Sequence, residues 1–255
     1  SQKDIEKSVE LIKESRSKYS YQIDGAVLKV DSLQAQDELG YTSKSPRWAV
    51  AFKFPSEEQT TILKDIKLQT GRTGAITPVA VLEPIDVGGA KVSFATLHNP
   101  DEIKRKDLRI NDYVIVRRAG DVIPEVVSSL KDRRDGSQKK WELPKKCPCG
   151  EFSIELIDEE KVPRCEGGQS CNLAKKEAII FFGSKSGLEI EGLGRETVET
   201  LLESKLINNV EDIYSLKYED LIDLPSWEKK KTNNLLNAIK SSTNASPEKL
   251  LTALG

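Results

Sequence analysis

The chain has 255 residues and a formal net charge of −2, and 37% of its residues are hydrophobic and 31% charged. This length suits one large domain or several small ones. The near-neutral charge excludes a whole-protein basic field, so nucleic-acid binding would have to come from local patches. No run of about 18 apolar residues occurs, so the sequence predicts no membrane-spanning helix.

The first quarter of the chain predicts one helix and two strands. Residues 5–17 carry apolar side chains at helical spacing among charges, which indicates an amphipathic helix. The segments IDGAVLKV (23–30) and WAVAFKF (48–54) are apolar runs of strand length. Pro46 predicts a turn before the second strand, and Pro55 ends that strand.

Each predicted strand delivers one lysine, Lys29 in the first and Lys53 in the second. The first strand also carries Asp24 beside the turn residue Gly25. Lysine offers phosphate a compact point charge, and Mg²⁺ prefers carboxylate oxygen. We therefore expect a phosphate that is handled together with a divalent cation. The alternative is an ordinary strand pair whose lysines reach into solvent.

The pattern changes between residues 60 and 127 to short apolar or alternating runs separated by glycines and Asn-Asp. About five short strands in about 70 residues predict a small closed β-barrel. The polar segment 132–146 predicts a linker after the barrel. Residues 131–146 hold seven Lys or Arg against three Asp or Glu, a local net charge of +4, and suit either a solvated linker or a nucleic-acid patch. The strands are expected at 62–68, 75–82, 91–96 and 113–117.

All four cysteines lie within 25 residues, as Cys147-Pro148-Cys149 and Cys165-x₅-Cys171. Without secretion signals, this cluster predicts a structural Zn²⁺ site with four thiolate ligands, rather than disulfides or unmetallated thiols. A single residue separates the first pair, which makes a tight chelate. A closed four-ligand site would hold the junction between the barrel and the following helices.

The last part of the chain predicts helices at 175–182, 195–204, 210–215, 228–241 and 247–254. Gly192 and Gly194 lie in the segment IEGLG (190–194) before one of these helices. Glycines there let the backbone approach phosphate, and the amides at the helix start supply donors. The alternative is an ordinary helix–helix turn. A second turn, LPSWE (224–228), has no glycines, and we take it as structural although Lys229–Lys231 follow it.

In chain order, the two lysine strands are followed by GRTGAITPVA (71–80), ATLHN (95–99), RRAGDVIPEVV (117–127), the four cysteines and IEGLG. These segments and their order resemble the NAD⁺-dependent DNA ligases of bacteria, over roughly residues 21–255. The resemblance implies a multidomain α+β fold of four parts. They are strands of a nucleotidyltransferase (ATP-grasp-like) domain at 1–55, an OB-fold at 56–140, a zinc finger at 141–172 and an incomplete all-α helix-hairpin-helix domain at 173–255.

The resemblance also implies an activity, the sealing of nicks in duplex DNA through an enzyme-adenylate and a DNA-adenylate, in replication and repair. The implied cofactors are NAD⁺, Mg²⁺ or Mn²⁺, and Zn²⁺, the last held by Cys147, Cys149, Cys165 and Cys171. Lys29 and Lys53 would contact the phosphates of NAD⁺ or the adenylate, and Asp24 would act through the metal or by positioning a lysine. The partner would be nicked double-stranded DNA without sequence preference, and the protein a cytoplasmic bacterial monomer.

For DNA binding, the resemblance implies that Arg72, Thr73, Arg118, Val122 and Ile123 touch the duplex around the nick, together with Gly192 and Gly194. Guanidinium groups bind phosphates bidentately, and apolar wedges press into a widened minor groove. The alternative for the barrel residues is a rim with exposed arginines and a buried Val–Ile pair. The single histidine, His98, is expected to be a hydrogen-bonding residue of the barrel.

A nucleophilic lysine in a Lys-x-Asp-Gly motif is expected of such ligases, and this sequence contains none. The nearest string, Arg133–Gly136, has arginine in that position, which stays protonated and cannot be the nucleophile. We therefore expect the chain to be the middle and C-terminal part of a ligase and not to become adenylylated alone. A non-catalytic DNA-binding clamp is the rival. An RNA ligase or capping enzyme shares the strands but does not predict the cysteines followed by IEGLG.

Overall fold

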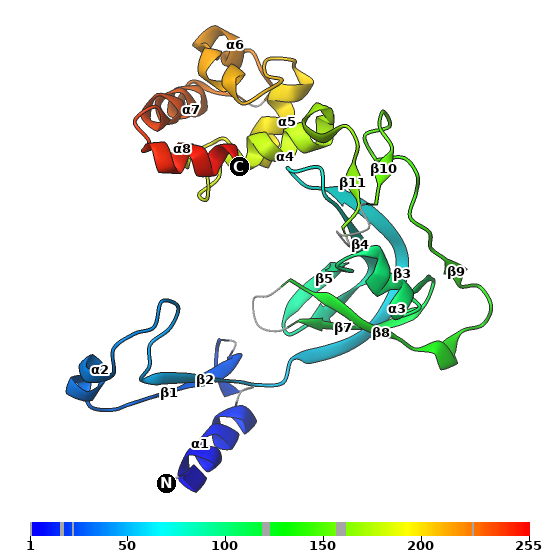
Figure 1. The fold of residues 1–255 in the computed structure, drawn as a ribbon, viewed down its shortest axis with the longest axis vertical. Coiled ribbons are helices and arrows are strands. Elements are labelled where there is room, and N and C mark those ends of the chain that lie inside the picture. The colour runs from blue at the N-terminus through cyan, green and yellow to red at the C-terminus, as the bar shows by residue number, and fades with distance from the viewer. Residues whose placement is uncertain (1, 16–17, 22, 119–122, 157–161, 226) are drawn as a thin grey trace. The chain divides into compact units, whose positions relative to one another are not determined.

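The computed structural model describes residues 2–15, 18–21, 23–118, 123–156, 162–225 and 227–255 (Figure 1). The chain divides into two compact units. The first contains residues 1–66, 80–96 and 106–140, and the second contains 67–79, 97–105 and 141–255. The GRTG turn therefore belongs to the same unit as the cysteines and the C-terminal helices. No helix in the described parts of the chain is long and apolar enough to cross a bilayer.

The first unit begins with a helix and a two-stranded antiparallel ribbon. Residues expected to be loop between the two strands form a short helix, which was not predicted. Both ends of this helix have ordinary capping residues. At its start the Ser32 hydroxyl accepts a hydrogen bond from the Ala35 amide at 3.3 Å, and at its end Gly40 has a positive φ. The elements are α1 (Gln2–Glu14), β1 (Gly25–Lys29), α2 (Leu33–Leu39) and β2 (Ala49–Lys53).

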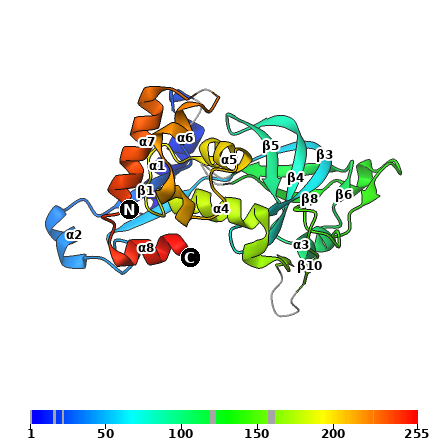
Figure 2. The same cartoon turned by 90° about the horizontal axis from the view of Figure 1, so that it is seen from above.

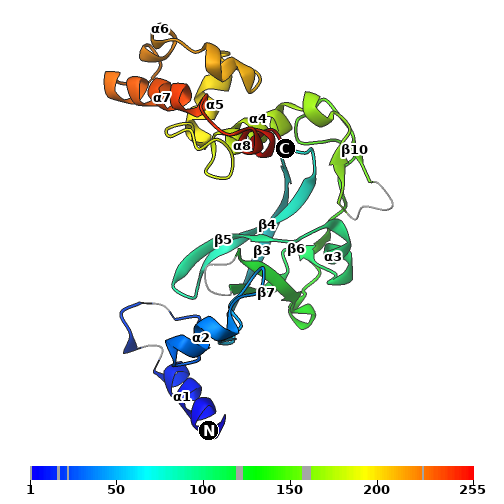
Figure 3. The ribbon, with the colours of Figure 1, turned by 60° about the vertical axis from the view of Figure 1, so that its left-hand side comes forward.

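Five strands close into a barrel in the order β3-β4-β5-β8-β7. Figure 3 shows the long, curved strands β3 and β4 and their neighbours β5 and β7. Strands β3 and β7 pair antiparallel, and β5 meets β8 in parallel at Thr96 and Glu125. A five-stranded Greek-key barrel is the OB-fold, so the expected fold is confirmed. The strands are β3 (Glu57–Thr70), β4 (Ile76–Val87), β5 (Ala90–Thr96), β7 (Tyr113–Arg118) and β8 (Glu125–Ser129), with helix α3 (Pro100–Arg105) between β5 and β7.

Apolar side chains alternate along these strands, and this alternation decides which face of each strand is buried. In β4, Ile76, Pro78, Ala80 and Leu82 are buried, and the residues between them are partly exposed. Successive side chains of a strand point to opposite faces, so one face of β4 supplies the barrel core and the other meets solvent.

The segment predicted as a linker at 132–146 is not a free linker. Lys139–Lys140 form strand β9, which pairs with β6 (Arg109–Ile110), and Lys131–Arg133 form the 3₁₀ helix η2. Arg134 forms ion pairs with Asp107 and with the fully buried Asp112. The prediction failed because these partners lie more than 20 residues away in the sequence, where charge density alone gives no sign of pairing.

The second unit combines short strands around the cysteines with a set of helices that share one core (Figure 2). Leu193, Val198, Leu201 and Leu235 are among its buried residues. The predicted helix at 210–215 is a 3₁₀ helix, and the other predicted helices are α-helical. The elements are β10 (Ile154–Glu155), β11 (Arg164–Cys165), η3 (Gly168–Ser170), α4 (Asn172–Gly183), α5 (Arg195–Glu203), η4 (Glu211–Ser215), α6 (Tyr218–Ile222), α7 (Lys229–Ser242) and α8 (Pro247–Leu254).

Candidate nucleotide site, DNA interface and metal centre

The two predicted phosphate-binding lysines lie on one face of the β1–β2 ribbon. Lys53 is paired with Gly25, four residues before Lys29 on the same strand. Paired residues share a face and a strand rises about 3.3 Å per residue, so the two Cα atoms lie about 13 Å apart along that face. Both side chains are exposed. Their flexible stems allow them to converge on an extended polyphosphate.

Asp24 lies at the start of β1, on the other face of the ribbon from the lysines. The ladder continues to this residue because the Phe54 amide donates to the Asp24 carbonyl at 2.9 Å. The glycine that follows is required by packing: a Cβ on Gly25 would lie 2.5 Å from the Phe52 carbonyl oxygen. Close backbone packing thus explains why a glycine follows Asp24. Because successive side chains of a strand point to opposite faces, the Asp24 carboxylate does not lie on the face that carries the lysines.

Lys29 has an aromatic neighbour that sequence reasoning missed. Its Nζ lies 6.0 Å from the centroid of the Trp48 ring, and Tyr41 meets that ring edge-on with centroids 5.9 Å apart. A cation at this distance from an indole is at the limit of a favourable contact. No signal in the local pattern predicts the contact, because Trp48 precedes β2 by one residue and reaches Lys29 only through strand pairing.

The barrel contributes two of the predicted DNA-contacting residues at the ends of β7 and β8. Arg118 ends β7, and its neighbour Arg117 is held by Glu125, with 3.0 Å between Nε and the carboxylate oxygen. Ile123 is 72% exposed, so the alternative that it is buried is wrong for this residue. Val122 lies outside the described residues. An exposed isoleucine is compatible with an apolar wedge that enters the minor groove.

The GRTG turn joins β3 to β4 and packs beside the cysteines. The Gly71 amide donates to the Ala75 carbonyl at 2.7 Å, and Gly74 has a φ of +78°. Thr73 is exposed, and its carbonyl accepts a hydrogen bond from Arg164 Nη1 at 3.3 Å. Arg72 is half-buried, and its guanidinium carbon lies 4.2 Å from the centroid of the Phe181 ring. Phe181 is therefore a partner of Arg72 that the sequence did not reveal.

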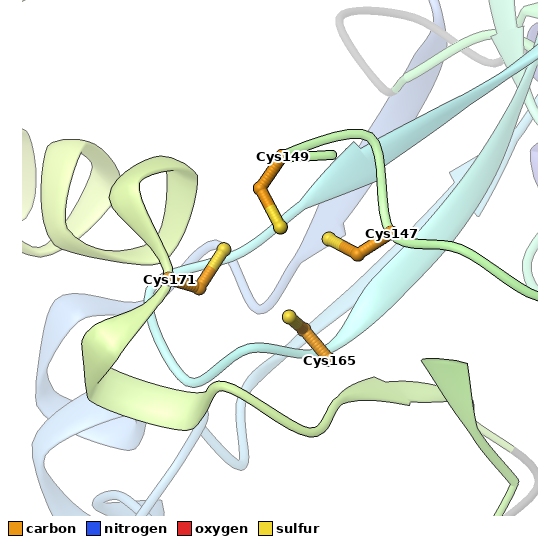
Figure 4. A group of neighbouring side chains, drawn as sticks. All are labelled: Cys147, Cys149, Cys165 and Cys171. Atoms are coloured by element: carbon orange, nitrogen blue, oxygen red, sulfur yellow. The ribbon is translucent and has the colours of Figure 1, made fainter. Parts of the chain in front are cut away.

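The four cysteines converge on one point (Figure 4). Their sulfur atoms all lie within 4.8 Å of one another, although only Pro148 separates Cys147 from Cys149. The short spacing is accommodated by a tight turn in which the Gly150 amide donates to the Cys147 carbonyl at 2.9 Å. Zn–S bonds of about 2.3 Å in a tetrahedron fit such a cluster with small adjustments. The donor set therefore fits zinc.

The surroundings of the thiols differ, and so do their pKa values. Burial raises the pKa of Cys165 to about 12 and also raises that of Cys147. At Cys149 burial acts in the same direction, but the amides of Phe152 and Glu151 outweigh it and bring the pKa down to about 7. Metal ligation requires the thiolate form, so metal binding releases protons at this site. Cys171 is also the N-cap of α4, where the helix dipole favours negative charge.

The IEGLG turn lies between helices α4 and α5 and directly precedes the helix expected after it. Gly192 has a φ of +87°, and Gly194 is the N-cap of α5 and has no side chain to cap it. Leu193 between them is buried and packs against Gly183 of α4, where an added Cβ would lie 2.9 Å from its Cδ2. Gly194 has open space around its missing Cβ. The buried Leu193 anchors this loop in the helical core, while Gly192 and Gly194 on either side of it are exposed.

The second turn also joins two helices, α6 and α7. Helix α7 begins with Lys229, Lys230 and Lys231, and its first turn contains no acidic residue. Lys231 Nζ lies 4.5 Å from the centroid of the buried Trp227 ring. His98 has an exposed side chain and a φ of +60°. Among the described residues, it is not part of a cluster of possible metal ligands.

An OB barrel, a four-thiolate site and a helical region with a glycine turn occur together in this chain, a combination typical of multidomain nucleic-acid-binding proteins. Comparison with known families supports a narrower statement. Residues 1–57 match the NAD-dependent DNA ligase adenylation domain, and residues 60–138 match the NAD-dependent DNA ligase OB-fold domain. The chain belongs to the NAD-dependent DNA ligase family.

Curated relatives agree over nearly the whole chain. It is 48% identical over 255 residues to the DNA ligase of Bacillus subtilis (strain 168) and 47% identical over 253 residues to that of Thermoanaerobacter sp. (strain X514). These matches cover 98% and 99% of the chain and 38% of each relative. A third, the DNA ligase of Coxiella burnetii (strain RSA 331 / Henzerling II), is 48% identical over 241 residues, which are 94% of the chain and 36% of that ligase. The chain thus spans less than two fifths of the relatives it matches.

Proposed function

We propose that the protein containing this chain seals nicks in duplex DNA with NAD⁺ as cofactor, within the bacterial cytoplasm. The observation that carries the proposal is the order of the two matched domains, adenylation followed by OB-fold, within one chain. Lys29 and Lys53, which share a face of the ribbon, bind the phosphates of NAD⁺ and of the adenylate. Asp24 serves by holding Mg²⁺ or Mn²⁺, because it lies on the other face of the ribbon from the two lysines that it could otherwise position.

The barrel and the helical region bind the DNA. Arg72, Thr73 and Arg118 bind phosphates near the nick, and Val122 and Ile123 press into the minor groove. Gly192 and Gly194 let phosphate approach the amides at the start of α5. Most of these contacts are to the backbone, so binding is independent of sequence and weakens steeply with salt. The protein acts as a monomer.

Zinc has a structural role in this proposal. Four thiolates leave no open coordination position, so the ion joins the GRTG turn to the start of α4 and does no chemistry. This support is visible in the hydrogen bond from the Cys165 amide to the Gly74 carbonyl, at 2.9 Å. When NAD⁺ is bound it supplies the activated adenylate, while residues of this chain bind and orient phosphates.

The test replaces the matching segment of the Bacillus subtilis ligase with this chain and measures nick sealing with NAD⁺. We expect sealing by the hybrid and a loss of at least about tenfold in Lys29→Ala and in Lys53→Ala, because each removes a phosphate contact of about 1.5–3 kcal/mol. A hybrid that folds, binds nicked duplex and seals nothing would overturn the enzymatic proposal.

The second candidate is a DNA-binding clamp without chemistry. It is favoured by one observation, that the 255 residues contain no Lys-x-Asp-Gly motif. Direct binding of nicked duplex by the chain alone, followed by fluorescence anisotropy, is expected under both candidates. Only the ligase predicts that Lys29 and Lys53 matter more for sealing by the hybrid than for binding by the chain.

A further inference from the structure

A cavity of about 240 Å³ lies in the second unit, between the GRTG turn and helices α4 and α8. Its walls are mixed, with Ala178, Ile179 and Leu254 among the apolar lining residues and Gln169 and Asn209 among the polar ones. Two cationic side chains also line it, Arg72 from the turn and Lys175 from α4. Both are half-buried.

Neither cation has an anionic partner in the described parts of the chain. Arg72 contacts the Phe181 ring but forms no ion pair there, and Lys175 likewise has none. The neighbouring Lys176, by contrast, pairs with Glu199 at 3.0 Å. Two half-buried cations facing one cavity repel each other, and Glu211, which also lines the cavity, forms an ion pair with neither of them. An anion bound between them would remove that repulsion.

Phe181 holds Arg72 in a useful orientation. A guanidinium lying over an aromatic ring keeps its N–H donors in its own plane, where they remain available to oxygen atoms. Stacking also restricts a side chain that otherwise loses much rotamer freedom on binding. Arg72 thus offers guanidinium N–H donors at this cavity, with Nη1 next to Gly255, and Lys175 supplies a point charge from the adjacent helix.

We propose that Arg72 and Lys175 together bind one phosphate of the DNA backbone in this cavity, and that Phe181 positions Arg72 for it. Lys175 thereby becomes a DNA contact that no sequence motif indicated. The inference rests on the proposed DNA-binding function and adds a residue and a shared phosphate to it. Glu211 also lines the cavity, is exposed and has no partner among the described residues. Its carboxylate opposes the bound phosphate.

The test measures binding of a fluorescent nicked duplex to the chain between about 50 and 200 mM salt. Neutralising one phosphate contributes about 0.9 to the slope of log Kd against log salt concentration. Arg72→Gln and Lys175→Gln should each weaken binding and lower that slope by less than about 0.9, since the other cation still holds the phosphate. The double variant should lower it by about 0.9 in total. A loss of about 1.8 would mean two separate phosphates and would contradict the sharing.

Two further variants separate charge from position. Phe181→Leu removes no charge, so it should weaken binding severalfold and leave the salt slope unchanged. Glu211→Gln removes the opposing carboxylate and should tighten binding. Lys217→Gln is the matched control, because Lys217 is exposed, belongs to the same unit and does not line the cavity. Circular dichroism melting curves check that each variant is folded.

The outcomes distinguish this inference from the proposed function. If the unmodified chain does not bind nicked duplex, DNA binding by this chain fails as a whole. If the chain binds and Lys175→Gln has the salt slope of Lys217→Gln, only the shared phosphate site fails. If pyrophosphate raises the melting temperature of the DNA-free chain through Lys175, while Lys175→Gln binds nicked duplex with the affinity and salt slope of Lys217→Gln, the cavity takes a free anion and the assignment to DNA is overturned.

Discussion

Arg134 binds Asp112 bidentately, with Nε 2.8 Å from one carboxylate oxygen and Nη2 2.8 Å from the other. Asp112 is 0% exposed, so its charge is satisfied inside the barrel unit. The same guanidinium donates to the Asp107 carboxylate at 2.7 Å. One arginine from the segment after the barrel thus pairs with two carboxylates of the segment between α3 and β7, and this ties the two segments together.

Arg134→Ala is therefore expected to destabilise the chain strongly. Removing one partner of a buried ion pair leaves an uncompensated charge, which costs about 3–5 kcal/mol. Urea unfolding followed by circular dichroism measures the loss. Arg133→Ala is the control, since Arg133 is exposed and lies 5.4 Å from the Tyr113 ring, a contact of about 0.5–1 kcal/mol. Equal losses in the two variants would contradict the prediction, and adding Asp112→Asn to Arg134→Ala should recover part of the loss.

The same cluster makes stability depend on pH. The hydrogen bond from Arg134 lowers the pKa of Asp107 to about 2, below its ordinary value of 3.8. A carboxylate with a lowered folded-state pKa stabilises the fold above its unfolded pKa and loses that contribution as the pH falls towards the folded value. The effect is moderated by solvent, because the Asp107 side chain is 33% exposed.

The free energy of unfolding should therefore decline between about pH 4 and pH 2, and Asp107→Asn should flatten that decline. At pH 5 and above the variant should be less stable than the parent chain, with the two converging near pH 2. Unfolding curves in urea across this range measure the difference. A constant difference at every pH would show that Asp107 acts by packing and not by its charge.

Zinc removal should unfold the cysteine segment and leave the barrel strands formed. Four thiolates and one ion predict a stoichiometry of one zinc per chain, measured by elemental mass spectrometry. Cobalt substitution should give the visible absorption of a tetrahedral thiolate site. Cys149→Ser should lower the metal affinity by at least about tenfold, whereas Ser170→Ala, beside a ligand but not one itself, should not. Full zinc occupancy in Cys149→Ser would exclude Cys149 as a ligand.

The two glycines of the first hairpin should respond differently to alanine. Gly192 has a φ of +87°, so Gly192→Ala should lower the free energy of unfolding by about 1 kcal/mol or more. Gly194 has an ordinary φ of −84° and open space around it, so Gly194→Ala should fold and lose only the N-cap preference for glycine, about 0.5 kcal/mol. If phosphate approaches this loop closely, Gly194→Ala should still weaken binding of nicked duplex about tenfold. Unchanged binding would remove Gly194 from the DNA interface.

Much of the fold follows from local rules. The alternation in β4 depends on neighbouring residues, and α8 begins where Ser246 accepts a hydrogen bond from the Lys249 amide and Pro247 has no amide to satisfy. The four cysteines identified a metal site because thiolates clustered in sequence are rarely far apart in space. The resemblance to the ligases could also be recognised from the sequence, because each of the ordered motifs is a short contiguous segment.

The sequence by itself determined the lysine strands, the barrel and the cysteine site of this protein. The tertiary structure alone decided which distant side chains meet: Arg134 with Asp112, Arg72 with Phe181, and Arg72 and Lys175 around one cavity. It also decided that Asp24 and the lysines lie on different faces of their ribbon. Strand register and side-chain packing fix such relationships, and both depend on residues that are far apart in the chain.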